Sequence, residues 1–168
     1  ADLVSSSLQC AESFVEQREQ LGTGHAVAQV LPILREDAIT LILYGDVPLI
    51  QTQTLERLVA GCTAQSMTLL TVTLDNPQGY GRICRNTDNE VTSIVEQKDA
   101  DPEQLLINEV NTGIMCIQQS CLAAWLPLLS NSNAQNEYYL TDVVAMAVAQ
   151  GIGVTSVDAP SPEEVEGV

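Results

Sequence analysis

Apolar and polar positions follow one another along this chain in blocks that predict alternating strands and helices. The continuous apolar run at Ala38–Leu43 predicts a strand that is buried on both faces, and Met67–Leu74 predicts a second strand. Polar turn formers separate two short segments around "NTDN", which is typical of a hairpin. The remaining predicted strands are Ser13–Glu16, the hairpin segments Arg82–Arg85 and Val91–Glu96, Val110–Ile117 and Gly153–Ala159.

Apolar residues at helical spacing predict the helices. The clearest is Thr52–Cys62, where Leu55, Leu58 and Val59 share one face and Thr52 or Thr54 can cap the amino end. The other predicted helices are the end of one at Asp2–Leu8, then Ala26–Leu34, Ser120–Leu129 and Asn136–Gln150. The last nine residues, "PSPEEVEGV", are expected to form an exposed acidic end.

Strands that alternate with helices indicate an α/β fold with a mixed, mainly parallel sheet flanked by helices, and the hairpin adds an antiparallel element. In such sheets, ligands bind beyond the carboxyl ends of the strands. This rule selects Gly22–Gly24, Tyr44–Pro48 and the region around Asn111.

Composition limits what this domain can bind. The chain has 168 residues and 45% hydrophobic residues, enough for one domain with its own core. Its 22 acidic and 6 basic residues give a net charge of −16, which disfavours nucleic acid and anionic membranes as partners. No apolar stretch approaches the ~20 residues of a membrane helix, and no signal-peptide pattern opens the chain.

Cysteine usage points to the cytosol. The five cysteines are odd in number, widely spaced and without a CxxC pair, which favours isolated buried thiols over a disulfide framework or a zinc site. They are Cys10, Cys62, Cys84, Cys116 and Cys121.

Asp46 is the first candidate for chemistry. It follows a predicted buried strand in "YGDVPL", where a carboxylate at the sheet edge can bind a divalent cation such as Mg²⁺. The alternative is a turn aspartate or an N-cap of the next helix.

Gly22-Thr23-Gly24 precedes a predicted helix, so main-chain N–H groups there can face an anionic ligand. The alternative is a plain turn, because neither a Walker loop nor a dinucleotide fingerprint occurs in the chain. His25, the only histidine, is expected to be a packed or capping residue, and no Ser-His-Asp or Cys-His arrangement can be built on it.

Three further positions could bind a polar ligand such as a sugar. Gly81 in "GYGR" permits close main-chain approach, while Glu96 and Asn111 stand at strand ends and can hydrogen-bond hydroxyl groups. Taken singly, each could equally be a turn or surface residue. Tyr138 and Tyr139 in "NEYYLTD" could line a sugar pocket or belong to the core. Trp125 and Phe14 are expected in the core.

An ordered set of motifs carries a family resemblance along the whole chain. "EQLGTGHA", "LYGDVPLI", "TVTLDNPQGYGRI", "IVEQKDA", "EVNTGI", "NAQNEYYLTD" and "EVEGV" occur in that order. Together they resemble the uridyltransferase domain of the bacterial bifunctional N-acetylglucosamine-1-phosphate uridyltransferases/glucosamine-1-phosphate acetyltransferases. The resemblance implies a Rossmann-like nucleotidyltransferase fold in a cytoplasmic enzyme that makes UDP-N-acetylglucosamine and pyrophosphate from UTP and N-acetylglucosamine-1-phosphate. That product feeds peptidoglycan and lipopolysaccharide synthesis.

The same resemblance assigns roles to residues. It implies that Asp46 binds Mg²⁺ and that no general base is needed, because the attacking sugar phosphate is already an anion. The implied substrate contacts are Gln17, Gly22 and Thr23 on the uracil side, Tyr44 and Gly45 beside the metal, and Gly81, Glu96 and Asn111 around the N-acetylglucosamine moiety, with Tyr139 and Thr141 as second contacts.

Parts of the family pattern do not occur in residues 1–168. These are the glycine-rich "LAAGxGTRM" loop that holds the triphosphate, the Asn metal ligand that follows "EVEGV", and the left-handed β-helix acetyltransferase domain that forms the trimer and binds acetyl-CoA. We therefore expect an incomplete uridyltransferase domain, truncated at both ends, that is inactive by itself. The basic residues of the absent loop would reconcile the −16 charge with anionic substrates.

Two alternatives remain open from the sequence. One is another sugar-1-phosphate nucleotidyltransferase, specific for glucose- or mannose-1-phosphate. The other is a non-catalytic acidic α/β interaction module, which would place Asp46, Gly81, Glu96 and Asn111 on different faces.

Overall fold

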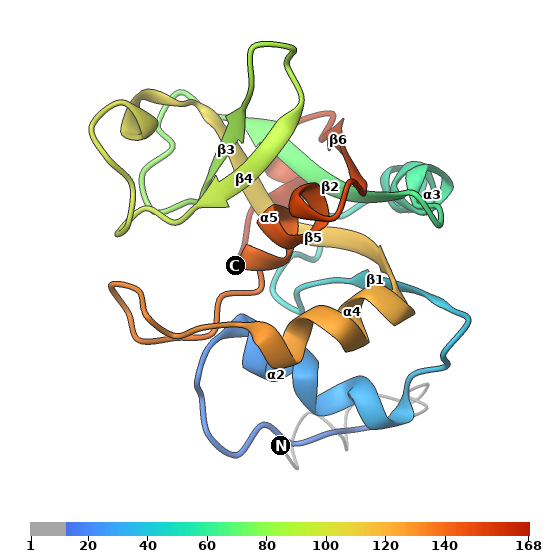
Figure 1. Ribbon diagram of the computed structural model, residues 1–168. Coiled ribbons are helices and arrows are strands. Elements are labelled where there is room, and N and C mark those ends of the chain that lie inside the picture. Colours follow the sequence, from blue (N-terminus) through green and yellow to red (C-terminus); the bar gives the residue numbers. More distant parts are fainter. Residues whose placement is uncertain (1–12) are drawn as a thin grey trace.

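The long strand β5 (Glu109–Gln118) organises a six-stranded sheet in this computed structural model, which describes residues 13–168. Strand β2 (Ser66–Thr73) pairs along one edge of β5. The other edge of β5 is shared by β1 (Ile39–Ile42) and β3 (Arg82–Arg85). The sheet order is β4-β3-β5-β2-β6, with β1 on β5, where β4 is Val91–Val95 and β6 is Gly153–Asp158 (Figure 1).

The α/β class, the mixed sheet and the β3–β4 hairpin are confirmed, but the expectation of a mainly parallel sheet is wrong for the described strands. Only β2 and β6 pair in parallel. The other pairings are antiparallel, because the chain returns from β2 to β5 through the hairpin rather than through a crossover helix. Local apolar runs identify strands without giving their relative direction.

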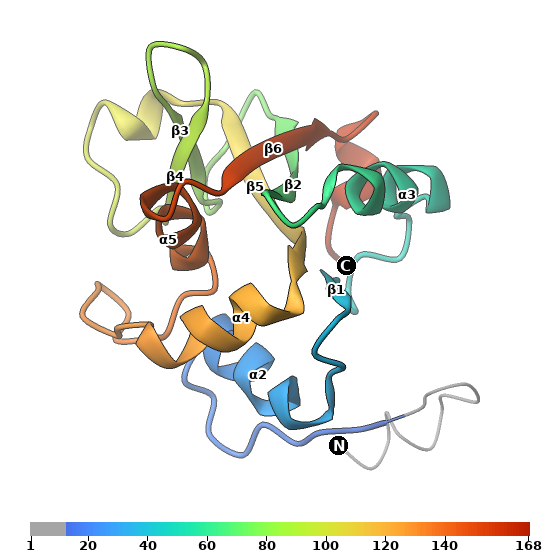
Figure 2. The same cartoon turned by 45° about the vertical axis from the view of Figure 1, so that its right-hand side comes forward.

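Within residues 13–168, four α-helices flank the sheet: α2 (Thr23–Val30), α3 (Thr52–Gly61), α4 (Gln119–Trp125) and α5 (Asp142–Ala149). Short 3₁₀ helices lie at Leu31–Ile33, Gln104–Leu106, Leu126–Leu128 and Pro162–Val165. Figure 2 shows α4 and α2 side by side below the sheet, and α3 on the opposite side of β2 from α5. None of the described helices is long and apolar enough to cross a membrane.

Several predicted elements differ from the structure. Ser13–Glu16 is not a strand, and Phe14 there is 52% exposed rather than core. The helix predicted from Asn136 begins only at Asp142, because Asn136 has a φ of 56° and the Asn133 side chain hydrogen-bonds the main chain of the loop. The helix end predicted at Asp2–Leu8 lies outside the described residues.

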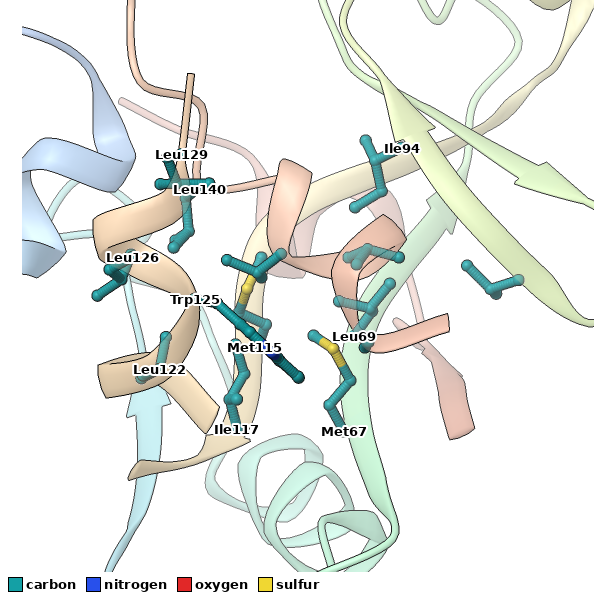
Figure 3. Packing of buried hydrophobic residues seen from close by; sticks show 14 of the residues in the cluster. Met67, Leu69, Ile94, Met115, Ile117, Leu122, Trp125, Leu126, Leu129 and Leu140 are labelled. Atoms are coloured by element: carbon teal, nitrogen blue, oxygen red, sulfur yellow. The ribbon is translucent and has the colours of Figure 1, made fainter. Parts of the chain in front are cut away.

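Alternate side chains of the central strands β2 and β5 pack into two separate hydrophobic cores, one on each face of the sheet. Met115 and Ile117 of β5 join Trp125 in one core under α4 and α5, which also contains Met67 and Leu69 (Figure 3). The intervening residues of β5 and β2 point to the opposite core under α3: Ile114, Cys116, Leu70 and Val72. This two-sided burial explains why β2 carries apolar side chains on both of its faces. The strand predicted at Ala38–Leu43 is less buried than expected, with Ile39 39% exposed.

The carboxyl-terminal residues fold back onto the loop after β1. The Glu164 carboxylate accepts a hydrogen bond from the Gln51 N–H at the start of α3 (3.1 Å), and the Val168 N–H donates to the Asp46 carbonyl oxygen (2.9 Å). The expectation of a wholly exposed acidic end is therefore wrong, because Glu164 and Val165 are buried. Figure 2 shows this end of the chain beside β1.

The four cysteines within residues 13–168 are free thiols, as expected, and Cys62 and Cys116 are buried. Cys10 lies outside the described part of the chain.

Candidate functional site

Three of the predicted sugar contacts lie together where β3, β4 and β5 meet. The Gly81 carbonyl oxygen accepts a hydrogen bond from the Asn111 N–H (2.9 Å). A Cβ placed on Gly81 would stand 3.4 Å from Glu96 Oε2 and 2.9 Å from Ile94 Cγ2. Glycine at position 81 therefore lets the main chain approach the Glu96 carboxylate closely.

The Glu96 carboxylate is held in place and stays near the protein interior. Thr141 Oγ1 donates a hydrogen bond to Glu96 Oε1 (2.9 Å). Burial raises the pKa of Glu96, and the nearby Asp142 and Asp99 carboxylates add to the increase, whereas the Thr141 hydrogen bond lowers it. This carboxylate has hydrogen-bond capacity left for a hydroxyl donor.

Asn111 presents a polar atom that the protein does not satisfy. The residue is 8% exposed, and its Oδ1 is buried without a hydrogen-bond partner among the described residues. A buried unpaired acceptor costs free energy, so such atoms are rare unless a ligand supplies a donor. Asn111 Oδ1 therefore has acceptor capacity for a hydroxyl or amide N–H donor, in a residue whose own main-chain N–H bonds Gly81.

Tyr139 and Asp99 form the next wall of this region. Tyr139 Oη donates a hydrogen bond to Asp99 Oδ2 (3.2 Å), and both residues line a cavity of about 250 Å³ with Glu96 and Asp142. Burial raises the pKa of Tyr139 to about 12, with the Asp99 carboxylate adding to the increase. Tyr139 is therefore a neutral donor that orients Asp99.

The loop after β1 connects this region to Asp46. The Tyr44 ring packs on Gly113 of β5, where a Cβ would stand 2.3 Å from Tyr44 Cε2. Burial raises the pKa of Tyr44, and the negative charges of the Glu96 and Asp46 carboxylates raise it further. Both carboxylates therefore interact electrostatically with the Tyr44 hydroxyl. The interaction-module alternative required Asp46, Gly81, Glu96 and Asn111 to lie on different faces. Gly81, Glu96 and Asn111 instead lie together, and Asp46 and Glu96 are both close enough to Tyr44 to affect its pKa. Gly113, with a φ of 86°, was missed as a separate candidate although it stands inside the "NTGI" motif.

Asp46 itself is exposed at the carboxyl end of β1, and its neighbour Gly45 has open space around it. The position that a Cβ on Gly167 would take lies 3.6 Å from Asp46 Oδ2, so the carboxyl-terminal segment runs beside this carboxylate. Within residues 13–168 no group of three or more His, Cys, Asp or Glu side chains could hold a metal ion. One free carboxylate fits Mg²⁺, which takes one or two carboxylates and fills its other positions with phosphate and water oxygens.

The predicted uracil contacts form a second group around the start of α2. Gly22 has a φ of 110°, and a Cβ there would stand 2.7 Å from the Tyr138 carbonyl oxygen. The Gly24 N–H donates to that same oxygen (2.8 Å), and the Leu140 N–H donates to Thr23 Oγ1 (3.1 Å). The Thr23 hydroxyl therefore already acts as an acceptor within the fold.

Gln17 closes this turn. Its Nε2 donates to the Gly22 carbonyl oxygen (3.1 Å) and lies 3.0 Å from His25 Nδ1. His25 Nε2 also lies 3.2 Å from Gln29 Nε2, so the ring lies between two glutamine side chains, as expected for a packed histidine. In the described part of the chain no hydrogen bond joins this group to Asp46; it reaches the Glu96 region through the Tyr138–Thr141 segment.

Comparison with known proteins gives one family. Residues 3–160 match the family described as Nucleotidyl transferase. "Bifunctional protein GlmU" of Marinobacter nauticus and the protein of the same name in Saccharophagus degradans are each 57% identical to the chain over 169 aligned residues. These matches cover 100% of the chain and 37% of each relative, so the chain spans little more than a third of the relatives' length.

Among solved structures, the fold is similar to that of a putative glucose-1-phosphate thymidylyltransferase from Bacillus anthracis, crystallised with a sucrose. The TM-score is 0.61 at 15% sequence identity, over 84% of this chain and 55% of that one. At this identity the likeness supports the fold alone.

Proposed function

Because this chain belongs to the nucleotidyl transferase family, we propose that its protein transfers UMP from UTP to N-acetylglucosamine-1-phosphate. The products are UDP-N-acetylglucosamine and pyrophosphate. The observation that carries the proposal is the buried, unpaired Oδ1 of Asn111, a residue whose main-chain N–H bonds Gly81, which in turn lies against Glu96. A neutral sugar rich in hydroxyl and amide groups satisfies such a site, whereas a purely anionic ligand does not.

On the sugar side, Glu96 accepts a hydrogen bond from a sugar hydroxyl and Asn111 Oδ1 accepts one from a second donor of the sugar. Gly81 supplies close main-chain approach at the same place. Thr141 and Tyr139 act as second contacts, chiefly by orienting Glu96 and Asp99.

On the uracil side, Gln17, Gly22 and Thr23 form the turn that meets the base. Because the Thr23 hydroxyl accepts from Leu140 and Gln17 Nε2 donates to Gly22, the free main-chain groups of this turn and the remaining capacity of the Gln17 amide are the groups that recognise uracil. Tyr44 and Gly45 line the path between the two groups beside Asp46.

Asp46 is the residue that would hold Mg²⁺. The metal, when bound, neutralises charge that develops on the reacting phosphates. The protein's own task is alignment: the sugar phosphate is an anionic nucleophile, and it must meet the α-phosphorus opposite the departing pyrophosphate. Glu96 and Asn111 fix the sugar, and the α2 turn fixes the base, so that this geometry is reached.

The names of the relatives support a larger protein with two activities. We propose that the full-length protein also acetylates glucosamine-1-phosphate, that it is a cytoplasmic homotrimer, and that its product serves cell-wall precursor synthesis. The second domain of that protein would carry the acetyl transfer and the trimer contacts.

The test uses the full reading frame that contains this chain. Pyrophosphate release is measured with UTP, Mg²⁺ and each of N-acetylglucosamine-, glucose- and mannose-1-phosphate. Turnover that requires UTP and prefers the 2-acetamido sugar supports the proposal. Preference for a sugar without that group would instead favour the alternative of another sugar-1-phosphate nucleotidyltransferase.

A further inference from the structure

Arg82 is a buried cation without a counter-ion among residues 13–168. The residue is 2% exposed, and the ion pairs found within residues 13–168 are Arg18–Glu16 and Arg85–Glu109, neither of which includes it. Its Nη1 donates to the Tyr80 carbonyl oxygen and its Nη2 to Gln97 Oε1 (2.7 Å), while its Nε has no partner in the described structure. All of its partners are therefore neutral.

Gln97 links Arg82 to the loop before it, and we call this pair of side chains the bracket. Gln97 Oε1, which accepts the hydrogen bond from Arg82 Nη2, also accepts one from the Gly79 N–H (3.2 Å). Gly79 has a φ of 94°, and nothing lies within 4 Å of the position that a Cβ would take there. The loop that precedes Gly81 is thus fastened at Gly79 and at Tyr80 by one pair of side chains.

This bracket stands at the centre of the proposed sugar site. Gly81 lies between Tyr80 and Arg82 in the chain, and Gln97 directly follows Glu96. The bracket therefore sets how the main chain at Gly81 lies relative to the Glu96 carboxylate.

A buried guanidinium with neutral partners only is costly, because burial removes its hydration and no carboxylate offsets the loss. Strand β3 contains a contrasting case: Arg85, three residues further on, pairs with Glu109 (2.6 Å) and hydrogen-bonds Ser156. Arg85 stabilises the sheet away from the site. Arg82 instead holds the Gly79–Gly81 loop, because its planar guanidinium donates to the Tyr80 carbonyl oxygen and to the Gln97 amide oxygen at the same time.

We propose that Arg82 and Gln97 are positioning residues for the sugar-1-phosphate, acting by holding the Gly79–Gly81 main chain against Glu96. The inference rests on the proposed function and deepens it. Gln97 contributes only an acceptor oxygen, so a carboxylate in its place keeps both hydrogen bonds, whereas an apolar side chain of similar size loses both.

The experiment compares Gln97→Leu with Gln97→Glu in the full reading frame. We expect Gln97→Leu to raise KM for N-acetylglucosamine-1-phosphate by about tenfold or more with KM for UTP within about twofold, since one lost positioning contact is worth about that much. Gln97→Glu should keep both constants near those of the parent. Arg82→Lys, which cannot reproduce the fork, should resemble Gln97→Leu, and Arg85→Lys serves as the control on the same strand.

A second readout does not depend on activity. Hydrogen exchange at the Gly79 amide should be faster in Gln97→Leu and unchanged in Gln97→Glu. Equal increases of both KM values in Gln97→Leu, or parent-like constants in that folded variant, would overturn the positioning role. Absence of any turnover in the unsubstituted protein would contradict the proposed function instead, and the Gly79 exchange would still report whether the bracket exists.

Discussion

The ring of Tyr44 lies on Gly113, with Cε2 only 2.3 Å from the point where a Cβ would stand. Position 113 therefore accepts only glycine if Tyr44 is to keep its place between the Glu96 and Asp46 carboxylates. The contact joins the loop after β1 to the middle of β5.

We expect Gly113→Ala to lose both stability and substrate binding. The positive φ alone costs about 1–3 kcal/mol for a non-glycine residue, and the new methyl group must also displace the Tyr44 ring. Gly151→Ala is the matched control, because Gly151 has a φ of 72° with nothing within 4 Å of its Cβ position. Urea unfolding should show a larger loss for Gly113→Ala, and equal losses would contradict the Tyr44 contact.

Asp46→Asn should remove activity without harming the fold. The side chain is exposed, and the fold uses the main-chain oxygen of Asp46 rather than its carboxylate in the contact with Val168. We expect kcat/KM to fall by about 100-fold or more, in keeping with the several kcal/mol a metal supplies to charge stabilisation, with Tm nearly unchanged. Asp88→Asn, an equally exposed aspartate in the hairpin turn, controls for the change in net charge. Retained turnover in Asp46→Asn would remove Asp46 from the metal site.

Glu96→Gln should show that the site costs stability at neutral pH. Burial, with Asp142 and Asp99, raises the pKa of Glu96 in the folded protein. The folded state then binds the proton more tightly than the unfolded state, so its stability falls as pH rises from the unfolded value through the folded pKa. We expect Glu96→Gln to be more stable than the parent at pH 7, and the difference to shrink as pH falls toward 4.5.

Thermal unfolding of the two proteins across that range measures the effect. Glutamine keeps an oxygen for the Thr141 hydroxyl, so loss of that hydrogen bond does not obscure the comparison. Sugar-phosphate binding should weaken in the same variant. A stability difference that grows on acidification would have the wrong sign for this account.

Thr23→Val should loosen the turn at the start of α2. The Leu140 N–H donates to Thr23 Oγ1, and valine leaves this donor without a partner in a buried segment. We expect a loss of about 1–3 kcal/mol, measured by denaturant unfolding, and a higher KM for UTP. Thr23→Ser retains the hydroxyl and should restore both. If serine and valine behave alike, the hydroxyl is not the group that matters.

The sequence alone was enough to place most elements and to identify the family. Thr52–Cys62 was expected as a helix and is one from Thr52 to Gly61, because its apolar spacing is strictly local. The motif order identified the family and selected Gly81, Glu96 and Asn111, which the fold brings together. The expected inactivity of the isolated chain stays a prediction.

Other features were decided by contacts between distant residues. Strand direction in the sheet depends on how the chain returns to β5, and the late start of α5 depends on the loop hydrogen bonds of Asn133. Glu164 looked like one more exposed acid, yet its carboxylate is buried and accepts the Gln51 N–H across more than a hundred residues of sequence. The motif "GYGR" drew attention to its glycines, and only the packing of β3 shows Arg82 buried and hydrogen-bonded to Gln97.

What the sequence determined by itself was the identity of the groups: a carboxylate after a strand, glycines in turns, and an amide and a carboxylate at strand ends. The identities of these groups depend only on residue type and local spacing, and both can be read directly from the sequence. The tertiary structure decided which groups face one another and which remain unsatisfied, such as Asn111 Oδ1 and the Arg82 guanidinium. Burial and pairing are properties of segments far apart in the chain, and they exist only once those segments have packed together.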